Sequence, residues 1–421
     1  MSLSTQPYKG ARDFYPEDKR LQKWMFYNLR QVVESFGYQE YDAPIVEPIE
    51  IYMSKTSEEI VVEQTFVFTD RGGRTVTLRP EMTPSVSRMV AARRQELAYP
   101  LRWYSLANFW RYERPQHGRL REHYQLNVDL FGVEDNEAEH EIILIAYTIL
   151  KSFNAKPETY EIRINSRIFL DEQLNRLDLS KEQKRQCLKL LDQQAKIDPD
   201  EFQKLFNGIL GEQKASNLLT VLKNQEAPET IRKLLKLLKD AGVSSASYDP
   251  SVVRGLEYYT DIVFEVFDTN PENNRAMFGG GRYDALVGAF GVEPVPTVGF
   301  GMGDVTLQNF LEGHKLLPKL ATETDAVVVL IGDVYEAAQQ ILAKLREEGL
   351  RLAVDSSGRK VDAQIKSAVK AGVPYVLFIG EQELTSKRFK LKNLASGEEK
   401  EMSAERVVST LASRHKHEVA L

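Results

Sequence analysis

The chain has 421 residues, of which 42% are hydrophobic and 28% are charged, and its formal net charge is −6. This length predicts roughly two or three domains with sizeable cores, and the acidic balance argues against a general nucleic-acid-binding protein. The single cysteine, Cys187, excludes an intramolecular disulfide and a cysteine-rich metal site. The sequence shows no apolar signal core after Met1 and no run of about 18 apolar residues, so we expect a cytoplasmic protein that does not cross a membrane.

The first elements are marked by their ends. A helical repeat of apolar residues begins at Pro16 and stops at Gly37, which fits the usual proline-first, glycine-last asymmetry of helices. The following segment, 38–48, contains two prolines and is expected to be an extended edge segment. Alternating runs at 65–69 and 74–78, joined by a Gly-Gly pair, predict a β-hairpin.

A helix, two strands and a second helix are predicted next. Thr83 is the expected N-cap of a helix that runs to about Leu97, with proline at its first position. The segments 101–112 and 122–132 predict two long antiparallel strands joined by a charged loop. A further helix is expected over 137–153.

The middle of the chain differs in composition. Residues 167–247 are rich in Leu, Lys, Gln, Glu and Asp without a strand pattern, and we expect an inserted module of amphipathic helices. Strand character returns at Val252. Glycine-dense runs at 279–281 and 299–303 predict turns around further short strands, where a ligand can approach the backbone closely.

The last part of the chain has its own pattern. The apolar run 326–331 is typical of a buried parallel strand. Helical and strand patterns then alternate, which predicts a small α/β domain with a mostly parallel sheet. The expected organisation is therefore a first domain, 1–320, interrupted by the insertion at 167–247, and a second domain, 325–421.

Two groups of residues are candidates for chemistry. Gln125, Asn127 and Asp129 alternate along one predicted strand, so they share a face that suggests a polar pocket floor near Arg111; an exposed, solvated sheet face is the alternative.

The second group begins at Arg254, which precedes a glycine and is followed by Tyr258 and Tyr259. An arginine offers a fork of donors suited to carboxylate or phosphate, although a surface arginine beside core tyrosines is the plainer interpretation. The glycine runs match neither the dinucleotide-binding nor the P-loop spacing. No histidine lies in a metal-ligand pattern, so no protein-bound catalytic metal is expected.

Taken together, these segments resemble the histidyl-tRNA synthetase family of class II aminoacyl-tRNA synthetases, in the expected order along almost the whole chain. The run Arg254-Gly-Leu-Glu-Tyr-Tyr resembles the histidine-specific signature. The other matching segments are Leu78-Arg-Pro-Glu-Met-Thr (substrate-binding turn), Phe109 to Asp129 (motif 2), Phe278-Gly-Gly-Gly-Arg-Tyr-Asp (partner of the signature) and Ser357-Gly-Arg-Lys (anticodon-binding domain). The implied fold is an α+β catalytic core with a mostly antiparallel sheet, a helical insertion and a C-terminal α/β anticodon-binding-type domain.

The resemblance implies roles for the matching residues. Arg111 is expected to bind the α-phosphate of ATP, and Arg254 is expected beside that phosphate and the amino-acid carboxylate. The expected substrate-binding residues are Glu81, Met82, Thr83, Gln125, Asp129, Tyr258 and Tyr259, with Asp129 and Tyr259 reading the imidazole ring. The residues expected near ATP or the tRNA end are Gln116, Arg119, Arg121, Gly299 and Gly301.

The implied reaction is ATP-dependent activation of L-histidine, followed by transfer to tRNA(His). Mg²⁺ would accompany ATP. A homodimer is also implied, with Pro44 at its interface.

One position departs from the family pattern. Motif 3 usually carries an arginine shortly after its glycine run, and Thr306 occupies that place. Either another cation substitutes, with Arg282 as one candidate, or ATP binding is altered. The alternative function is a synthetase-like subunit that senses histidine and regulates its biosynthesis without charging tRNA. Arg111, Arg254 and the C-terminal domain favour the synthetase, and a kinase-like or ATP-grasp enzyme lacks a supporting phosphate loop.

Overall fold

The structure is a computed structural model, and it describes residues 3–53, 64–114, 118–194, 197–254, 258–273 and 276–412. The chain divides into two compact units, Met1–Leu317 and Pro318–Leu421. Within the described ranges, no helix is both long enough and apolar enough to cross a membrane.

The first unit is built around an eight-stranded sheet in which most neighbouring strands run antiparallel. Its strands, in sheet order, are β1 (Gln39–Glu40), β5 (Leu101–Trp110), β6 (Glu122–Phe131), β11 (Thr297–Gly303), β10 (Ala276–Arg282), β9 (Ile262–Asp268), β7 (Tyr160–Ser166) and β8 (Ala246–Tyr248). Parallel pairing occurs at the two ends, between β1 and β5 and between β7 and β8. The predicted mostly antiparallel core is therefore confirmed.

Helices cover the apolar face of this sheet. The helices that share its main core are α1 (Pro16–Ser35), α5 (Glu137–Ser152), α10 (Glu229–Asp240) and α11 (Asp304–Gly313). Val128 and Phe300 point into this core and are 0% and 2% exposed. Strand side chains alternate between faces, so the polar residues of β6 and the glycines of β10 and β11 share the other face with buried apolar residues such as Phe131 and Val263. The helix predicted from Pro16 is confirmed, and Gly37, with a φ of 81°, follows its end.

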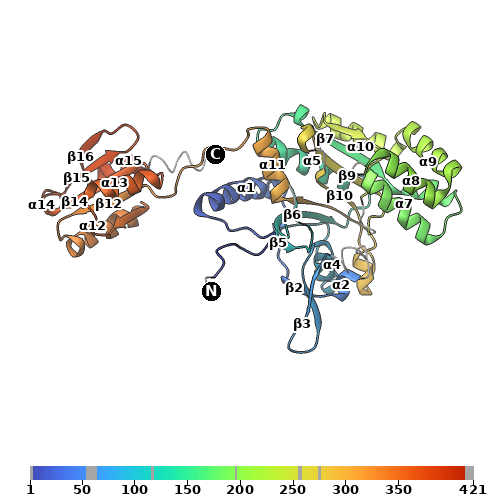
Figure 1. The fold of residues 1–421 in the computed structure, drawn as a ribbon, viewed down its shortest axis with the longest axis horizontal. Coiled ribbons are helices and arrows are strands. Elements are labelled where there is room, and N and C mark those ends of the chain that lie inside the picture. The colour runs from blue at the N-terminus through green and yellow to red at the C-terminus, as the bar shows by residue number, and fades with distance from the viewer. Residues whose placement is uncertain are drawn as a thin grey trace. The chain divides into compact units, whose positions relative to one another are not determined.

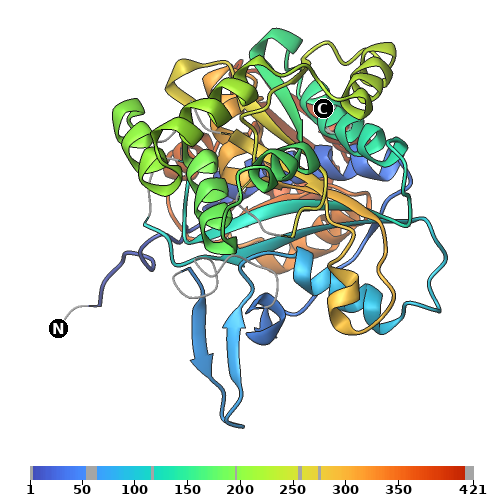
Figure 2. The same cartoon turned by 90° about the vertical axis from the view of Figure 1, so that its right-hand side faces the viewer.

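A three-stranded antiparallel sheet forms a separate layer of the first unit. Its strands, in sheet order, are β2 (Val46–Pro48), β4 (Thr75–Leu78) and β3 (Phe66–Thr69), and α2 (Glu50–Met53) follows β2. Strands β3 and β4 form the predicted hairpin, with the backbone N–H of Gly72 donating to Asp70 at 2.8 Å in the turn. The hairpin projects from the rest of the unit in both Figure 1 and Figure 2.

Helix α4 (Thr83–Ala92) differs from its prediction at both ends. Met82, rather than Thr83, precedes the first helical residue, and the helix stops at Ala92 rather than near Leu97. The polar run 93–96 offers no apolar face to bury, and tertiary packing is what normally extends a helix.

An inserted helical module follows β7 and has a core of its own. Its helices are α6 (Arg167–Asn175), α7 (Lys181–Gln193), α8 (Pro199–Leu210) and α9 (Glu212–Asn224). Figure 1 shows α7, α8 and α9 grouped at one edge of the first unit. The buried thiol of Cys187 lies in this core. Helix α10 packs instead into the main core through Ile231, Leu234 and Leu238, so the separately packed module ends with α9.

Two predictions for the region after the module are wrong. The strand predicted from Val252 begins only at Ile262. The glycine runs predicted as turns lie inside strands β10 and β11, which are paired along their length. The absence of side chains on these glycines therefore leaves room for other groups, since a glycine within a strand often marks the close approach of another group.

The second unit contains a five-stranded sheet with helices α12 (Tyr335–Glu347), α13 (Val361–Lys370), α14 (Glu381–Ser386) and α15 (Ala404–Ala412). Its strands, in sheet order, are β13 (Leu352–Asp355), β12 (Ala326–Ile331), β14 (Tyr375–Gly380), β15 (Arg388–Asn393) and β16 (Glu399–Ser403). The first three run parallel, as predicted, and an antiparallel pair extends one edge. Val328 and Val329 belong to separate apolar clusters, so both faces of this sheet are covered.

Candidate active site

The polar face of the main sheet carries a row of side chains from β6. Gln125, Asn127 and Asp129 alternate along this strand, as predicted. In the register with β11, Asp129 lies opposite Gly299 and Asn127 lies opposite Gly301. Asn127 and Asp129 are 4% and 2% exposed, which excludes a solvated sheet face. A buried polar row beside strands without side chains is suited to a small polar ligand.

The glycines of β10 and β11 make room for side chains that reach across this floor. A β-carbon on Gly301 would come within 2.5 Å of the side-chain nitrogen of Gln125. A β-carbon on Gly279 would overlap the guanidinium group of Arg254. Each of these glycines therefore accommodates one side chain of the site.

Asp129 is held on both carboxylate oxygens by tyrosines. Tyr41 donates to Oδ2 at 3.3 Å, and Tyr283 donates to Oδ1. Burial raises the pKa of Asp129 to about 7, although both hydrogen bonds favour its ionised form. The same carboxylate fills the space that a β-carbon on Gly299 would need. Neither tyrosine is assigned a role from the sequence, because each lies far from Asp129 along the chain.

A second buried carboxyl lies at the turn that leads into α4. Glu81 is 3% exposed and accepts a hydrogen bond of 3.1 Å from the hydroxyl of Tyr258. The ring of Tyr258 lies 4.9 Å from that of Tyr259 and 5.7 Å from that of Tyr283. Since Tyr283 also holds Asp129, the tyrosines bring the two carboxyls into one site.

The two residues after Glu81 have different surroundings. Met82 is fully buried in an apolar cluster that includes Phe109, so its side chain anchors the turn instead of facing the polar floor. Thr83 is 7% exposed, and its side chain lies near the Tyr258 hydroxyl, where it opposes the rise of the pKa of that tyrosine. Of these two predicted substrate-binding residues, Thr83 is the one whose side chain reaches the polar site.

Arg254 lies at the edge of the floor with its backbone in the left-handed region. Its φ is 51°, a conformation that costs a non-glycine residue about 1–2 kcal/mol. Its Nη1 lies 3.4 Å from Oε1 of Glu265 on β9, and its guanidinium carbon lies 5.5 Å from the ring centre of Tyr259. Backbone strain of this kind is concentrated at functional sites. Residues 255–257, which complete the signature, lie outside the described residues.

Arg111 directly follows β5 and lies near His123. Its Nε donates to the carbonyl oxygen of Pro80 at 2.8 Å, and none of the described residues accepts from its two Nη groups. Burial, together with the charges of Arg111 and Arg12, lowers the pKa of His123 to about 3. His123 is therefore neutral at physiological pH, with two guanidinium groups close to one ring.

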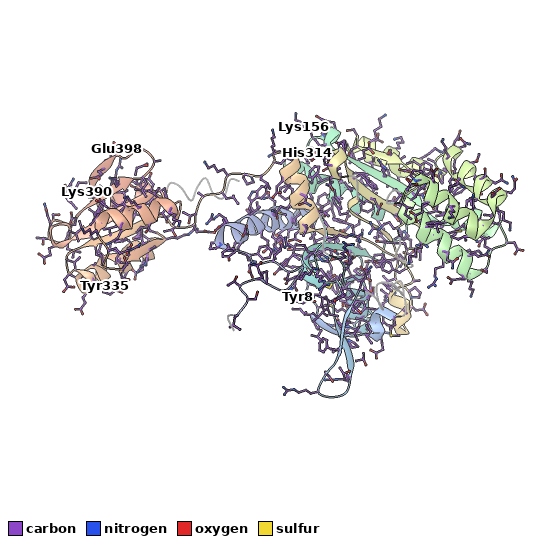
Figure 3. All side chains as sticks on the ribbon, in the orientation of Figure 1. Tyr8, Lys156, His314, Tyr335, Lys390 and Glu398 are labelled. Carbon is purple, nitrogen blue, oxygen red and sulfur yellow. The ribbon has the colours of Figure 1, made fainter. Side chains whose placement is uncertain are left out.

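The loop between β5 and β6 is braced from within and by the N-terminal segment. Arg119 forms an ion pair of 3.3 Å with Glu113. Arg121 donates Nη1 to the hydroxyl of Tyr8 at 2.8 Å. Tyr8 is labelled in Figure 3. Both predicted basic residues therefore lie in the loop that returns into β6. Gln116, predicted to meet the tRNA end, falls outside the described residues.

The structure removes Arg282 as a substitute for the cation missing at Thr306. Arg282 is 5% exposed, and its Nε pairs with Oε1 of Glu139 on α5 at 2.6 Å. Its other N–H groups are bonded to Asp284, to Glu139 and to carbonyl oxygens. The Thr306 hydroxyl donates to the carbonyl oxygen of Met277 at 2.7 Å. Arg282 thus ties β10 to α5, and its prediction as a nucleotide-facing cation is wrong.

In the second unit, the Ser357-Gly-Arg segment connects β13 to α13. Arg359 forms an ion pair of 3.0 Å with Asp355, and its Nε donates to the hydroxyl of Ser357 at 2.8 Å. The side chain of Arg359 stays 49% exposed, so this turn presents a positioned cation to solvent.

Comparisons with known proteins agree on one family. A family model for histidyl-tRNA synthetase matches residues 10–305, and a model for an anticodon binding domain matches residues 325–414. The chain is 44% identical over 411 residues to the histidine–tRNA ligase of Leptospira biflexa, with 94% of each chain covered. It is 37% identical over 415 residues to that of Thermoplasma volcanium, with 94% of this chain and 96% of the relative covered. The chain belongs to the histidyl-tRNA synthetase family, within class II of the aminoacyl-tRNA synthetases.

Solved structures share the fold. The crystal structure of histidyl-tRNA synthetase from Nostoc has a TM-score of 0.79 at 22% identity, with 98% of this chain and 100% of that chain covered. A Bacillus halodurans protein described as an ATP phosphoribosyltransferase regulatory subunit/histidyl-tRNA synthetase has a TM-score of 0.74 at 22% identity, with 90% and 100% covered. At these identities the likeness concerns the fold alone.

Proposed function

We propose that this chain activates L-histidine with ATP to histidyl-adenylate and transfers the histidyl group to the 3′ end of tRNA(His). One observation carries the proposal: the buried carboxyls of Asp129 and Glu81 share a glycine-lined floor with the guanidinium groups of Arg111 and Arg254. Histidine offers the complementary groups, because its amino group and ring N–H suit carboxylates and its carboxylate suits arginine.

Recognition of histidine is assigned to the two carboxyls and their neighbours. Glu81, Thr83 and Gln125 hold the α-amino group in this assignment. Asp129 accepts a ring N–H, and Tyr259 meets the other ring nitrogen, with Tyr258 holding Glu81 in place. A site whose buried polar groups pair with a polar ring rejects analogues that lack those groups by about 10⁴–10⁵-fold.

Adenylate formation is assigned to the two arginines. The carboxylate of histidine attacks the α-phosphorus of ATP, a new O–P bond forms, and pyrophosphate leaves with the electrons of the broken bond. Arg111 and Arg254 face the charge that grows on the phosphoryl oxygens, and they do so without changing protonation. Mg²⁺ that accompanies ATP would supply further charge neutralisation.

Transfer to tRNA is assigned to the β5–β6 loop and the second unit. A ribose hydroxyl of the tRNA end attacks the carbonyl carbon of the adenylate, and AMP leaves. Arg119 and Arg121 lie in the loop, and the exposed rings of Tyr8 and Tyr112 flank Arg121, a combination suited to nucleotide stacking.

The proposed division of labour follows the two units. Residues 1–320, with the inserted helices, carry the chemistry, and residues 325–421 bind the anticodon; the match to an anticodon-binding family model supports the second assignment. The cytoplasmic location stays a prediction.

Histidine-dependent exchange of pyrophosphate into ATP tests the proposed function. Wild-type protein should exchange only with L-histidine present, and Arg254→Ala should reduce the rate by about 10²–10³-fold because a transition-state cation is lost. Arg388→Ala is a matched control, since Arg388 pairs with Glu401 on the exposed surface of the second unit. Its exchange rate should equal that of wild type.

The threonine at position 306 favours a second candidate, a subunit that binds histidine and regulates its biosynthesis without charging tRNA. The same assay separates the two candidates. A protein that binds histidine but catalyses no exchange would contradict the synthetase function and support the regulatory one.

We further propose a homodimer that forms through the small sheet. Val46, Pro48 and Phe68 share one face of this sheet by register, and Val46 and Phe68 are each 45% exposed. Burial of such apolar surface stabilises association by about 25 cal/mol per Å².

Phe68→Asp should yield monomers in sedimentation equilibrium where wild type yields dimers, and a monomeric wild type would overturn this proposal. Tyr335→Asp, exposed on the second unit, is the control and should leave the dimer intact.

A further inference from the structure

We propose that Arg12 is a third fixed cation for the triphosphate of ATP, in addition to Arg111 and Arg254, and that an ion pair with Asp304 holds it in place. This role rests on the ATP-dependent function proposed above. In this proposal Arg12 supplies the positive charge near ATP that Thr306 cannot provide.

Asp304 fixes the position of Arg12. Nη2 of Arg12 lies 2.6 Å from Oδ2 of Asp304, which is 5% exposed in the first turn of α11. The other carboxylate oxygen of Asp304 accepts the backbone N–H of Tyr124 on β6 at 3.0 Å. The carboxylate is thus anchored to the main sheet, so the guanidinium group that pairs with it is anchored as well.

Arg12 retains unused donors. Its Nε is buried without a hydrogen-bond acceptor, and none of the described residues accepts from its Nη1. Among the described residues, no acceptor is bonded to the two Nη groups of Arg111 either. Buried donors without acceptors are costly, which makes a ligand rich in acceptor oxygens favourable at this place.

The two guanidinium groups act on the same small region. The backbone N–H of Arg121 donates to the carbonyl oxygen of Gly10, and the backbone N–H of Arg111 donates to the carbonyl oxygen of Arg121, each at 2.8 Å, so the segments that carry Arg12 and Arg111 flank the same stretch of chain. Both charges, together with burial, lower the pKa of His123. Asp304 offsets the charge of Arg12, whereas Arg111 has no carboxylate partner among the described residues, so the pair of guanidinium groups keeps a net positive charge that attracts an anion. A polyphosphate is such an anion, because it offers several charged oxygens to two rigid forks of donors.

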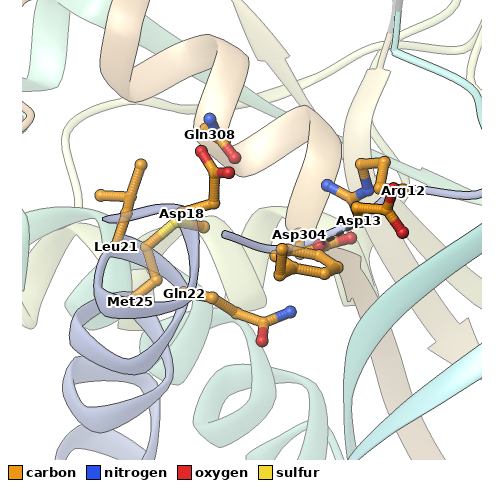
Figure 4. Close-up of a pocket in the computed structure, with 9 residues that line it drawn as sticks. Arg12, Asp13, Asp18, Leu21, Gln22, Met25, Asp304 and Gln308 are labelled. Atoms are coloured by element: carbon orange, nitrogen blue, oxygen red, sulfur yellow. Dashed lines mark hydrogen bonds and ion pairs between the residues drawn. The ribbon is translucent and has the colours of Figure 1, made fainter. Parts of the chain in front are cut away.

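The pocket that Arg12 lines together with acidic residues is unsuited to an anion. It has a volume of about 200 Å³ and opens between the start of α1 and the start of α11 (Figure 4). Asp13 and Asp18 line it, whereas Arg111 and His123 do not. The carboxylates repel phosphate, so the triphosphate is expected on the side of Arg12 that faces His123.

Exchange kinetics of Arg12→Met test this role, because methionine keeps the aliphatic stem and removes the charge. The KM values for ATP and for pyrophosphate should each rise by about 10–100-fold, since a charged hydrogen bond to the phosphates is lost. The KM for histidine should stay within about twofold of wild type. Arg12→Lys should recover part of the loss, and Asp304→Asn should give a smaller rise because it loosens the position of Arg12.

Lys9→Ala is the matched control, since it removes an exposed cation from the same segment. Unchanged KM values for ATP and pyrophosphate in Arg12→Met, at an unchanged melting temperature, would overturn the proposal. An equal rise in the KM values for all three substrates would also overturn it, because that pattern indicates lost structure.

A wild-type protein without exchange would refute the proposed function but leave the role of Arg12 testable. The shift of the melting temperature on addition of ATP alone should then be smaller in Arg12→Met than in wild type. An equal shift in the two proteins would overturn the role of Arg12 as a nucleotide-binding residue.

Discussion

The glycines of the two units serve different physical purposes. In the first unit, Gly279, Gly299 and Gly301 lie within paired strands, and a β-carbon on any of them would collide with a side chain of the site. In the second unit, Gly358 and Gly372 have φ values of 68° and 69° and nothing within 4 Å of an added β-carbon. The first group provides space for a ligand and its partners, whereas the second group provides a backbone conformation.

The two sheets also differ in the kinds of residue that their faces carry. The eight-stranded sheet packs the main core against one face, and its other face carries a row of polar side chains and glycines between smaller apolar clusters. The five-stranded sheet buries apolar residues on both faces, and Val328 and Val329 are each 0% exposed. A sheet covered on both faces leaves ligand contacts to its loops and edges, so chemistry is expected in the first unit and surface recognition in the second.

Removal of the second unit should have the largest effect, and it should reduce tRNA charging much more than adenylate formation. Without residues 318–421, charging of tRNA(His) should fall by about 10²–10⁴-fold, because a second point of attachment to the tRNA is lost. Pyrophosphate exchange should stay within about threefold of the full chain, since the residues proposed to form the adenylate all lie in the first unit. Parallel charging and exchange assays measure both effects. Equal losses in the two assays would contradict the separation of roles.

Asp129→Asn should raise the KM for histidine by about 10²-fold, because the negative charge proposed to pair with the ring N–H is lost and an NH2 group replaces one of the two acceptor oxygens. The same variant should be more stable than wild type at pH 8. The pKa of Asp129 rises from 3.8 to about 7 on folding, so the folded state binds its proton more tightly and loses stability as pH rises between these values. The expected gain in unfolding free energy is roughly 1–4 kcal/mol at pH 8 and vanishes near pH 4.

Thermal unfolding at the two pH values measures this difference for Asp129. The exposed Asp240, paired with Lys236, provides the control. Asp240→Asn should show no comparable pH dependence. A variant at Asp129 that loses stability at pH 8 would contradict a raised pKa for this carboxyl.

Gly301→Ala should reduce kcat/KM for histidine by about tenfold with little change in stability. The new methyl group would displace the amide of Gln125, whose Nε2 now donates to Asn127 at 2.9 Å, and it would meet no backbone atom at close range. One disturbed hydrogen bond corresponds to about 1 kcal/mol. Exchange kinetics and thermal unfolding together measure the two effects, and a large loss of stability with an unchanged KM would argue for a purely structural glycine.

Gly372→Ala should have the smallest effect and should leave exchange unchanged. Because Gly372 follows α13 in the left-handed region, alanine there should cost about 1–2 kcal/mol of unfolding free energy in the second unit.

Gly208, inside α8, provides the contrast: Gly208→Ala meets nothing within 4 Å and should stabilise the protein by about 0.5–1 kcal/mol. Thermal unfolding of both variants checks the pair, and equal signs would contradict the conformational explanation.

Local patterns in the sequence predict some parts of the site well. The alternation of Gln125, Asn127 and Asp129 sets their common face because the period of a strand fixes side-chain direction. The ends of α1 are predicted for a similar reason, since Pro16 and Gly37 are favoured at opposite ends of a helix. Both features depend on residues that are close in the chain.

Other parts depend on contacts that local patterns do not contain. Tyr41 and Tyr283 reach Asp129 across 88 and 154 residues of chain. The glycines of β10 and β11 are common turn residues, and only the side chains across the sheet explain their place within strands. The apolar stripe of α10 predicts an amphipathic helix, but a stripe does not specify which core it covers.

The contact between the N-terminal segment and the β5–β6 loop also determines when the site is completed during folding. The carbonyl oxygen of Gly10 accepts the backbone N–H groups of Arg121 and Glu122 at 2.8 and 3.1 Å, and the bonded side chains of Tyr8 and Arg121 are 113 residues apart in sequence. Contacts of such high sequence separation form late, because their loop-closure entropy must be offset by other structure. We therefore expect the sheet to assemble before the loop, so that competence to bind nucleotide is among the last properties the folding chain acquires.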